Sequence, residues 1–268
     1  MRFKRFNIFM NLNTKNYLRY AVGEILLVVV GILIALQVNN WNEERKLKLS
    51  EKKVLLSFYN EVSNNLNSLK TSIDEKKTII KINKEILNKT SPNSNWDSDV
   101  KIDSLMYYFT VSGWIYVSDN GVLNELVNSG QLNNIENNKI KSLIASLPQQ
   151  INQITEEDRL YRDDLHQYFL PFLGKNYRLR NITSYRELYA YNKSDLGNSK
   201  HELNDRKIIN SLEFENMLTI QAIWIKFSIE MCENLRIKYL SLQDLIEKKY
   251  PEVNFNELSQ NIESGFWG

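Results

Sequence analysis

An apolar run near the N-terminus constrains this chain more than any other feature of its sequence. Residues Ala21 to Val38 contain one charged side chain, Glu24, and the twelve residues from Ile25 to Leu36 are all apolar or glycine. A helix rises about 1.5 Å per residue, so about 20 residues span a hydrocarbon core of about 30 Å. A buried core helix is the alternative, but these twelve residues leave no polar face for water. We therefore predict a transmembrane helix over residues 20–38.

The residues on either side of this helix predict that it is retained and oriented. A cleaved signal peptide also has a basic start and an apolar run, but residues 36–39 offer no small-residue cleavage site. Trp41 stands where an interfacial aromatic residue would anchor the helix. Basic residues before the helix stay in the cytoplasm by the positive-inside rule, and here they are Arg2, Lys4, Arg5, Lys15 and Arg19. We expect a single-pass inner-membrane protein with residues 1–19 in the cytoplasm and residues 39–268 in the periplasm.

The segment around this helix also resembles a known family. Residues 23–43, GEILLVVVGILIALQVNNWNE, are similar to the signature of an uncharacterised family of membrane-anchored proteins found in Bacteroidetes-type bacteria and catalogued as a domain of unknown function. Residues 122–132, VLNELVNSGQL, more weakly resemble a helix ending of the same family. The resemblance implies an N-terminal anchor and carries no particular activity.

One side of the predicted membrane helix has the composition of a helix–helix contact. Glu24, Gly31 and Ala35 fall at i, i+7 and i+11, which places them on one stripe. Small residues let helices approach closely, and a carboxyl on the same face could form a hydrogen bond across the contact. The alternative is that Glu24 lies only about 5 Å inside the membrane edge and snorkels to water. The stripe predicts contact with a second copy of the chain or with a partner membrane protein.

The rest of the chain is predicted to be all-helical. Nine glycines and four prolines in 268 residues are too few for the frequent turns of a sandwich or barrel. Helical spacing of apolar residues predicts long helices over residues 42–90, 140–172 and 205–249, the first continuing from the membrane helix. Shorter helices are expected at 100–110, 120–128 and 184–191, and residues 111–117 have a weaker strand-like pattern. We expect residues 39–250 to form an antiparallel helical bundle, followed by a tail over 251–268.

Each long segment has an apolar stripe expected to face the core. In the first, the stripe is Leu47, Val54, Phe58, Val62, Leu66, Leu69, Ile73, Ile80 and Leu87, with Lys76 and Lys77 assigned to a solvated face. In the second it is Ile140, Leu143, Leu147, Ile151, Ile154, Tyr161, Leu165, Tyr168 and Phe172. In the last it is Met217, Ile220, Trp224, Phe227, Met231, Leu235, Tyr239, Leu242 and Ile246. Pro148 is expected to kink or interrupt the second helix, and Pro171 with Gly174 to end it.

The sequence contains no familiar catalytic motif. It has no phosphate-binding glycine loop, nucleophile elbow, HExxH or paired CxxC. The densest group of titratable residues is Glu157, Asp158, Arg159, Arg162, Asp163, Asp164 and His166. A metal site there would need further converging ligands, so a charged, solvated helix face explains the group more simply. We expect no metal, no cofactor and no catalytic residue.

The single cysteine and the apolar stripe of the last helix are also explained by packing. Cys232 lies next to that stripe, where a lone cysteine usually behaves as a small buried apolar residue. The Met217, Trp224, Phe227 and Met231 stripe could form the floor of a ligand pocket, but every core helix needs such a stripe.

Charge and topology together narrow the class of function. Five basic residues and one acid give the first 38 residues a charge of +4, which leaves −2 for the remainder of a chain whose total is +2. A nucleic-acid-binding domain is usually strongly basic, so no nucleic-acid partner is expected. The leading hypothesis is a membrane-tethered helical scaffold or partner-binding module of the cell envelope. The alternatives are a periplasmic ligand-sensing bundle that signals through a partner membrane protein, and an enzyme with an unrecognised site.

Overall fold

The computed structural model describes residues 10–93, 99–111, 115–182, 197–202, 205–255 and 257. Throughout these ranges the secondary structure consists of helices and turns, with no strand, which confirms the all-helical class. The chain divides into two units, Met1–Val54 and Leu55–Gly268.

A single helix, α1, runs from Met10 to Leu87 and includes the predicted membrane segment. No glycine or proline occurs between Ala35 and Leu87, so the residues that most weaken a helix are missing there. The large apolar side chains from Val22 to Val38 are all exposed. By length and composition this helix could cross a membrane. The predicted long N-terminal apolar helix is therefore present.

The remaining described helices lie in the second unit. They are α2 (Asp99–Val111), α3 (Gly121–Asn128), the 3₁₀ turn η1 (Gln131–Asn134), α4 (Asn138–Asp164), the π-helical turn η2 (Leu165–Phe169), α5 (Leu170–Asn176), α6 (Leu179–Ile182), α7 (Asp205–Ile209) and α8 (Leu212–Lys249). Side-chain caps begin the two long ones. Asn137 accepts hydrogen bonds from the backbone amides at the start of α4, and Ser211 accepts one from Phe214 at the start of α8.

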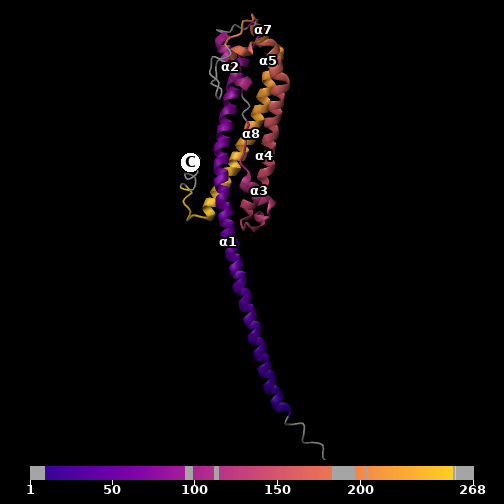
Figure 1. Cartoon of the computed structure of the whole chain (residues 1–268), viewed down its shortest axis with the longest axis vertical. Coiled ribbons are helices and arrows are strands. Elements are labelled where there is room, and N and C mark those ends of the chain that lie inside the picture. Colours follow the sequence, from indigo (N-terminus) through magenta and orange to yellow (C-terminus); the bar gives the residue numbers. More distant parts are fainter. Residues whose placement is uncertain are drawn as a thin grey trace, which may run out of the picture. The chain divides into compact units, whose positions relative to one another are not determined.

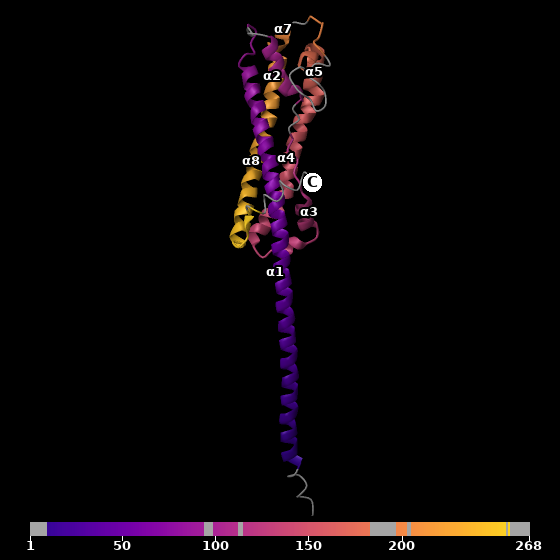
Figure 2. The same ribbon diagram turned by 60° about the vertical axis from the view of Figure 1, so that its left-hand side comes forward.

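Three helices of this unit, α1 from Leu55 onward, α4 and α8, lie side by side in both views (Figures 1 and 2). Hydrogen bonds fix their relative order, and the residue pairs are Tyr59–Glu247, Asn83–Leu218, Ser146–Lys238 and Asp158–Ser228. These pairs show that α1 and α4 run in the same direction and that α8 runs in the opposite direction. Between α2 and α3, Tyr116 bonds to Asp158 of α4 and Asp119 bonds to Asn65 of α1, so residues 115–120 lead back toward the Tyr59 end of the long helices before α3 begins.

The core stripe predicted for α4 is largely correct. The one predicted for α1 is correct only in its middle, since Leu47 is 48% exposed and Ile79 and Ile86 are buried in place of Ile80 and Leu87. Phe58, Val62, Leu69 and Ile73 of α1 are buried. The same is true of the α4 residues Ile140, Leu147, Ile151, Ile154 and Tyr161. Their side chains contribute to the apolar interior that the three long helices share.

The stripe predicted for the first half of α8 is wrong by one position. Ile220 and Phe227 were expected in the core, but they are 44% and 49% exposed. The buried positions are Phe214, Leu218, Gln221, Ile225, Ser228, Cys232, Leu235, Tyr239, Leu242 and Ile246. Because α8 has apolar residues on nearly every side, periodicity alone allows more than one stripe there.

Pro148 does not interrupt the second long segment, and Pro171 and Gly174 do not end it. α4 continues through Pro148, which is exposed. The chain passes through the π-helical turn and on into α5, which includes both Pro171 and Gly174. Pro171 lies in the first turn of α5, where a missing amide hydrogen costs little. The π turn adds a residue to the helical repeat, so Phe169 is buried and the predicted core residue Tyr168 is 62% exposed.

The short elements are partly as expected. α2 and α3 lie within one residue of their predicted bounds, and Gly130 follows α3 with a φ of 78°, in the left-handed region that favours glycine. Residues 115–117 of the strand-like stretch are extended without forming a strand, and residues 112–114 lie outside the described ranges. The helix predicted at 184–191 also lies outside them.

Candidate functional site

A buried ion pair lies at the centre of the second unit. Lys76 of α1 places its Nζ atom 2.9 Å from Oδ1 and 3.0 Å from Oδ2 of Asp158 on α4. Both side chains are 4% exposed. The prediction that these two residues belong to solvated faces is therefore wrong. A buried charge is costly unless it is paired and hydrogen-bonded, so the contacts around this pair matter for the whole fold.

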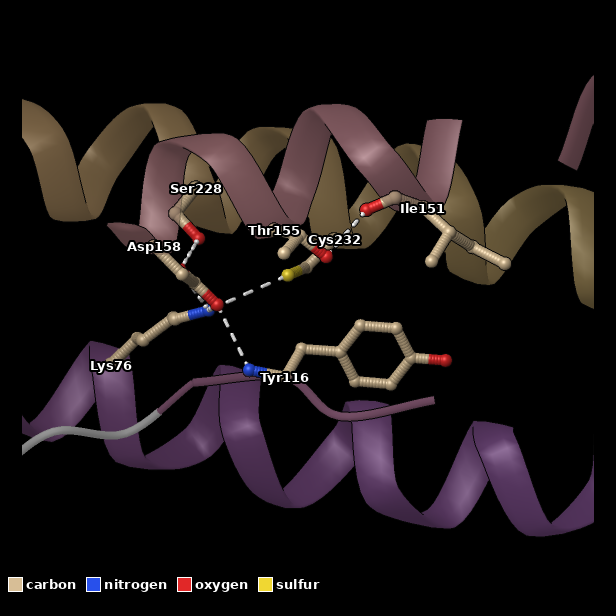
Figure 3. Close-up of polar contacts among 7 residues, drawn as sticks. All are labelled: Lys76, Tyr116, Ile151, Thr155, Asp158, Ser228 and Cys232. Atoms are coloured by element: carbon tan, nitrogen blue, oxygen red, sulfur yellow. Dashed lines mark hydrogen bonds and ion pairs between the residues drawn. The ribbon is translucent and has the colours of Figure 1, made fainter. Parts of the chain in front are cut away.

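Asp158 accepts two further hydrogen bonds, each from a different segment. The Ser228 hydroxyl of α8 donates to Oδ1 at 2.6 Å, and the backbone amide of Tyr116 donates to Oδ2 at 2.9 Å. Figure 3 shows the carboxylate between the side chains of α1 and α8 and the extended chain at Tyr116. One carboxylate thus links α1, α4, α8 and the returning segment 115–120. We call Lys76, Tyr116, Asp158, Ser228 and Cys232 the buried polar cluster.

Cys232 completes the cluster and is fully buried, in keeping with the expectation of a small buried residue. Its Sγ lies 3.7 Å from Lys76 Nζ. Burial raises the pKa of the Cys232 thiol, and the nearby Lys76 ammonium only partly opposes this effect. The thiol therefore stays protonated at neutral pH, whereas a nucleophilic cysteine needs a lowered pKa and an accessible thiolate.

A second group of hydrogen bonds holds the returning segment and α3 against α1. The Glu61 carboxylate accepts from the backbone amides of Val122 at 2.5 Å and Leu123 at 2.9 Å. Asn65 donates to the Asp119 carbonyl at 2.7 Å and accepts from the Asp119 amide at 2.8 Å. These amides lie at the start of α3, where free N–H groups need acceptors. Glu61 caps the Val122 and Leu123 amides, and the Asp119 side chain accepts from the Gly121 amide at 3.3 Å.

We expect Glu61 to make the stability of the protein depend on pH. Burial raises the pKa of Glu61, although the Val122 and Leu123 amides act in the opposite direction. A carboxyl with a higher pKa in the folded than in the unfolded chain holds its proton more tightly when folded. Its contribution to the free energy of unfolding is therefore largest below the unfolded pKa and is lost as pH rises through the folded pKa.

Denaturation of the wild type and of Glu61→Gln between about pH 7 and about pH 4, a range that includes the usual glutamate pKa, measures this effect. The stability of the wild type relative to Glu61→Gln should increase as pH falls. Glu125→Gln, at an exposed carboxyl of α3, is the matched control and should show no such trend. A wild-type advantage that is constant with pH would contradict the assignment.

The other residues of the predicted titratable group do not converge. Arg159 forms ion pairs along the exposed side of α4, with Glu156 at 2.6 Å and with Asp163. Burial raises the pKa of Asp164. Within the part of the chain that the structure describes, no three His, Cys, Asp or Glu side chains are placed to hold a metal ion. Asp158 alone of this group takes part in the buried polar cluster.

The candidate residues of the predicted membrane helix lie on an unbroken part of α1. Glu24, Gly31, Ala35 and Trp41 are all exposed. A Cβ atom added at Gly31 would meet nothing within 4 Å outside its own helix. The spacing of Glu24, Gly31 and Ala35 places these residues on one side of α1. Their role as an interface stays a prediction.

The buried polar cluster is suited to fixing how segments pack. The ion pair is nearly inaccessible to solvent. The hydrogen bonds of the cluster are formed between its own members. Such a network specifies one arrangement of the helices, because a shift of any member leaves a charge or an amide without its partner.

Comparison with known proteins yields no relative. No family model, no curated protein and no solved structure matches this chain. The resemblance of residues 23–43 to a family of anchored proteins therefore stays a prediction that rests on those residues.

Proposed function

We propose that this chain is a membrane-tethered helical module of the cell envelope that binds a protein partner. The observation that carries the proposal is α1, in which an exposed apolar segment continues into the helix of the second unit without a break. In this proposal the membrane segment anchors the chain in the inner membrane as a single pass. The basic residues before it remain in the cytoplasm and the second unit, an antiparallel helical bundle, lies in the periplasm.

The buried polar cluster supports a binding role over a catalytic one. Its ionisable groups are bonded to one another inside the bundle, and the Cys232 thiol is kept protonated by burial. The proposal assigns recognition to the exposed side of the predicted membrane helix, where Glu24, Gly31 and Ala35 share one stripe.

Crosslinking in membranes tests the proposal. The full chain should stay in the membrane fraction after an alkaline carbonate wash, and a crosslinker should trap it with a second copy or with another membrane protein. Glu24→Gln combined with Gly31→Leu should reduce the trapped species, because the stripe loses its carboxyl and its close approach. Gly23→Leu is the matched control, since Gly23 lies about 100° around the helix from Glu24.

Two results would count against the proposal in different ways. Release of the chain by carbonate would remove the anchor itself. An unchanged crosslinking pattern in Glu24→Gln/Gly31→Leu would leave the anchor in place and eliminate the stripe as the contact surface.

A further inference from the structure

The outer seam between α1 and α8 contains lysines that face one another. Lys77 of α1 forms an ion pair with Glu233 of α8 at 2.9 Å. Seven residues are about two helical turns, so a residue seven positions away lies on the same side of its helix. Because α8 runs opposite to α1, Lys84 and Lys226 therefore come to one level of this seam. At the level of Lys77 and Glu233 the two helices have opposite charges. At the level of Lys84 and Lys226 both helices have a positive charge.

The lysines of this level form no ion pair within the described ranges, and the acids nearest to them in sequence are Glu85 and Glu230. Lys81, Lys84 and Lys226 are exposed, and none forms an ion pair or hydrogen bond within the described ranges. Glu233 is already shared between Lys77 and Arg236, whose Nε lies 2.7 Å from its carboxylate. Residues 39–268 have a formal charge of −2 as a whole. The positive charge of these lysines therefore belongs to this part of the surface and is not a property of the whole segment.

A hollow lies beside these side chains on α1. It has a volume of about 410 Å³ and is lined by Lys77, Ile80, Lys81, Lys84, Glu85 and Asn88. Ile80 packs against the hydrophobic core and gives the hollow an apolar side. Glu85, the acid of the lining, has interactions of its own. We call this hollow, together with Lys226, the lysine groove.

We propose that the lysine groove binds an anion of the phosphate class. Lysine ammonium groups are common phosphate ligands because each provides a compact positive charge with three donors. A bound phosphate group would reduce the repulsion between Lys84 and Lys226 and give Lys81 a counter-ion. Long lysine side chains recognise charge more than shape, so the groove fits either a free phosphate compound or a phospholipid headgroup. This site is separate from the membrane-helix contact proposed above.

Calorimetric titration of the full chain in a neutral detergent at low salt tests the groove. The probes are inorganic pyrophosphate, for a free phosphate compound, and glycerol 3-phosphate, for a phospholipid headgroup. Lys81→Gln combined with Lys84→Gln should weaken binding of the tighter probe by about ten-fold, as expected for the loss of two exposed ionic contacts. Added salt should weaken wild-type binding because the contacts are screened.

The matched control is Lys139→Gln combined with Lys175→Gln, which removes two exposed lysines elsewhere in the second unit. This variant has the same net charge as the groove variant and should bind like the wild type. Either order of affinity between the two probes supports the groove and identifies the source of the phosphate. Absence of binding by both probes, or equal weakening in the two double variants, would overturn the proposal.

Discussion

Replacing Asp158 with asparagine is expected to lower the free energy of unfolding by about 3–5 kcal/mol, the usual cost of leaving one member of a buried ion pair without its partner. Asparagine has nearly the shape of aspartate and retains an oxygen acceptor. It removes the charge that balances Lys76, whose side chain is only 4% exposed. Chemical denaturation of the full chain in mild detergent, followed by circular dichroism, measures the loss.

Two further variants separate the buried pair from general effects of charge. Asp163→Asn removes a carboxylate from the exposed side of the same helix and should cost at most about 1 kcal/mol. Lys76→Met combined with Asp158→Leu removes both buried charges and should recover much of the loss, because no unpaired charge remains. The recovery will be incomplete, since Ser228 and the Tyr116 amide lose their acceptor. If Asp158→Asn were as mild as Asp163→Asn, the pair would not be buried as described.

Replacing Gln221 with leucine is expected to raise the free energy of unfolding by about 1–3 kcal/mol, the usual cost of a buried polar group without a hydrogen bond. Gln221 is fully buried on the core side of α8, and neither its Nε2 nor its Oε1 has a hydrogen-bond partner among the described residues. Leucine fills a similar volume and brings no polar atom into the apolar interior. The same denaturation experiment detects the increase.

The same substitution at another position of α8 provides the control. Gln243 donates a hydrogen bond to the Ser63 hydroxyl of α1 at 2.8 Å, so Gln243→Leu should lower stability. The two changes are chemically identical and differ in whether the amide has a partner. A loss of stability in Gln221→Leu as well would mean that a bound water or ligand satisfies the Gln221 amide.

The buried ion pair left a trace in the sequence. The apolar stripe predicted for the first long helix steps from Ile73 to Ile80, and that of the second steps from Ile154 to Tyr161. Each step is seven residues, twice the usual spacing, and so each omits one core position. The omitted residues are Lys76 and Asp158, which have opposite charges. The first stripe also steps by seven from Ile80 to Leu87, where the omitted residue is the buried but uncharged Asn83. Periodicity could thus predict buried polar positions, but it does not single out the ion pair or say which helices meet.

The core side of α8 could not be predicted in the same way. Its true stripe is interrupted by Gln221 and Ser228, while the neighbouring Ile220 and Phe227 give a more apolar pattern that is exposed in the structure. The choice between the two stripes depends on polar contacts with other helices, such as the bond from Ser228 to Asp158. Such contacts join residues 70 positions apart in sequence, beyond the reach of a local pattern. Prediction was therefore sound for helix positions and weak for the polar interior.

The π-helical turn between α4 and α5 makes the contacts that follow it depend on one extra residue. Its extra residue is absorbed within the helix, so that the buried side chains Tyr161, Leu165, Phe169 and Leu173 follow one another at steps of four. Deleting one residue from Leu165–Phe169 would restore ordinary helical winding and turn everything after it by about 100°. Tyr177, which donates a hydrogen bond to Asp103 of α2, would then lose its register. In evolutionary terms, a single-residue insertion is fixed here by the contacts that now depend on it.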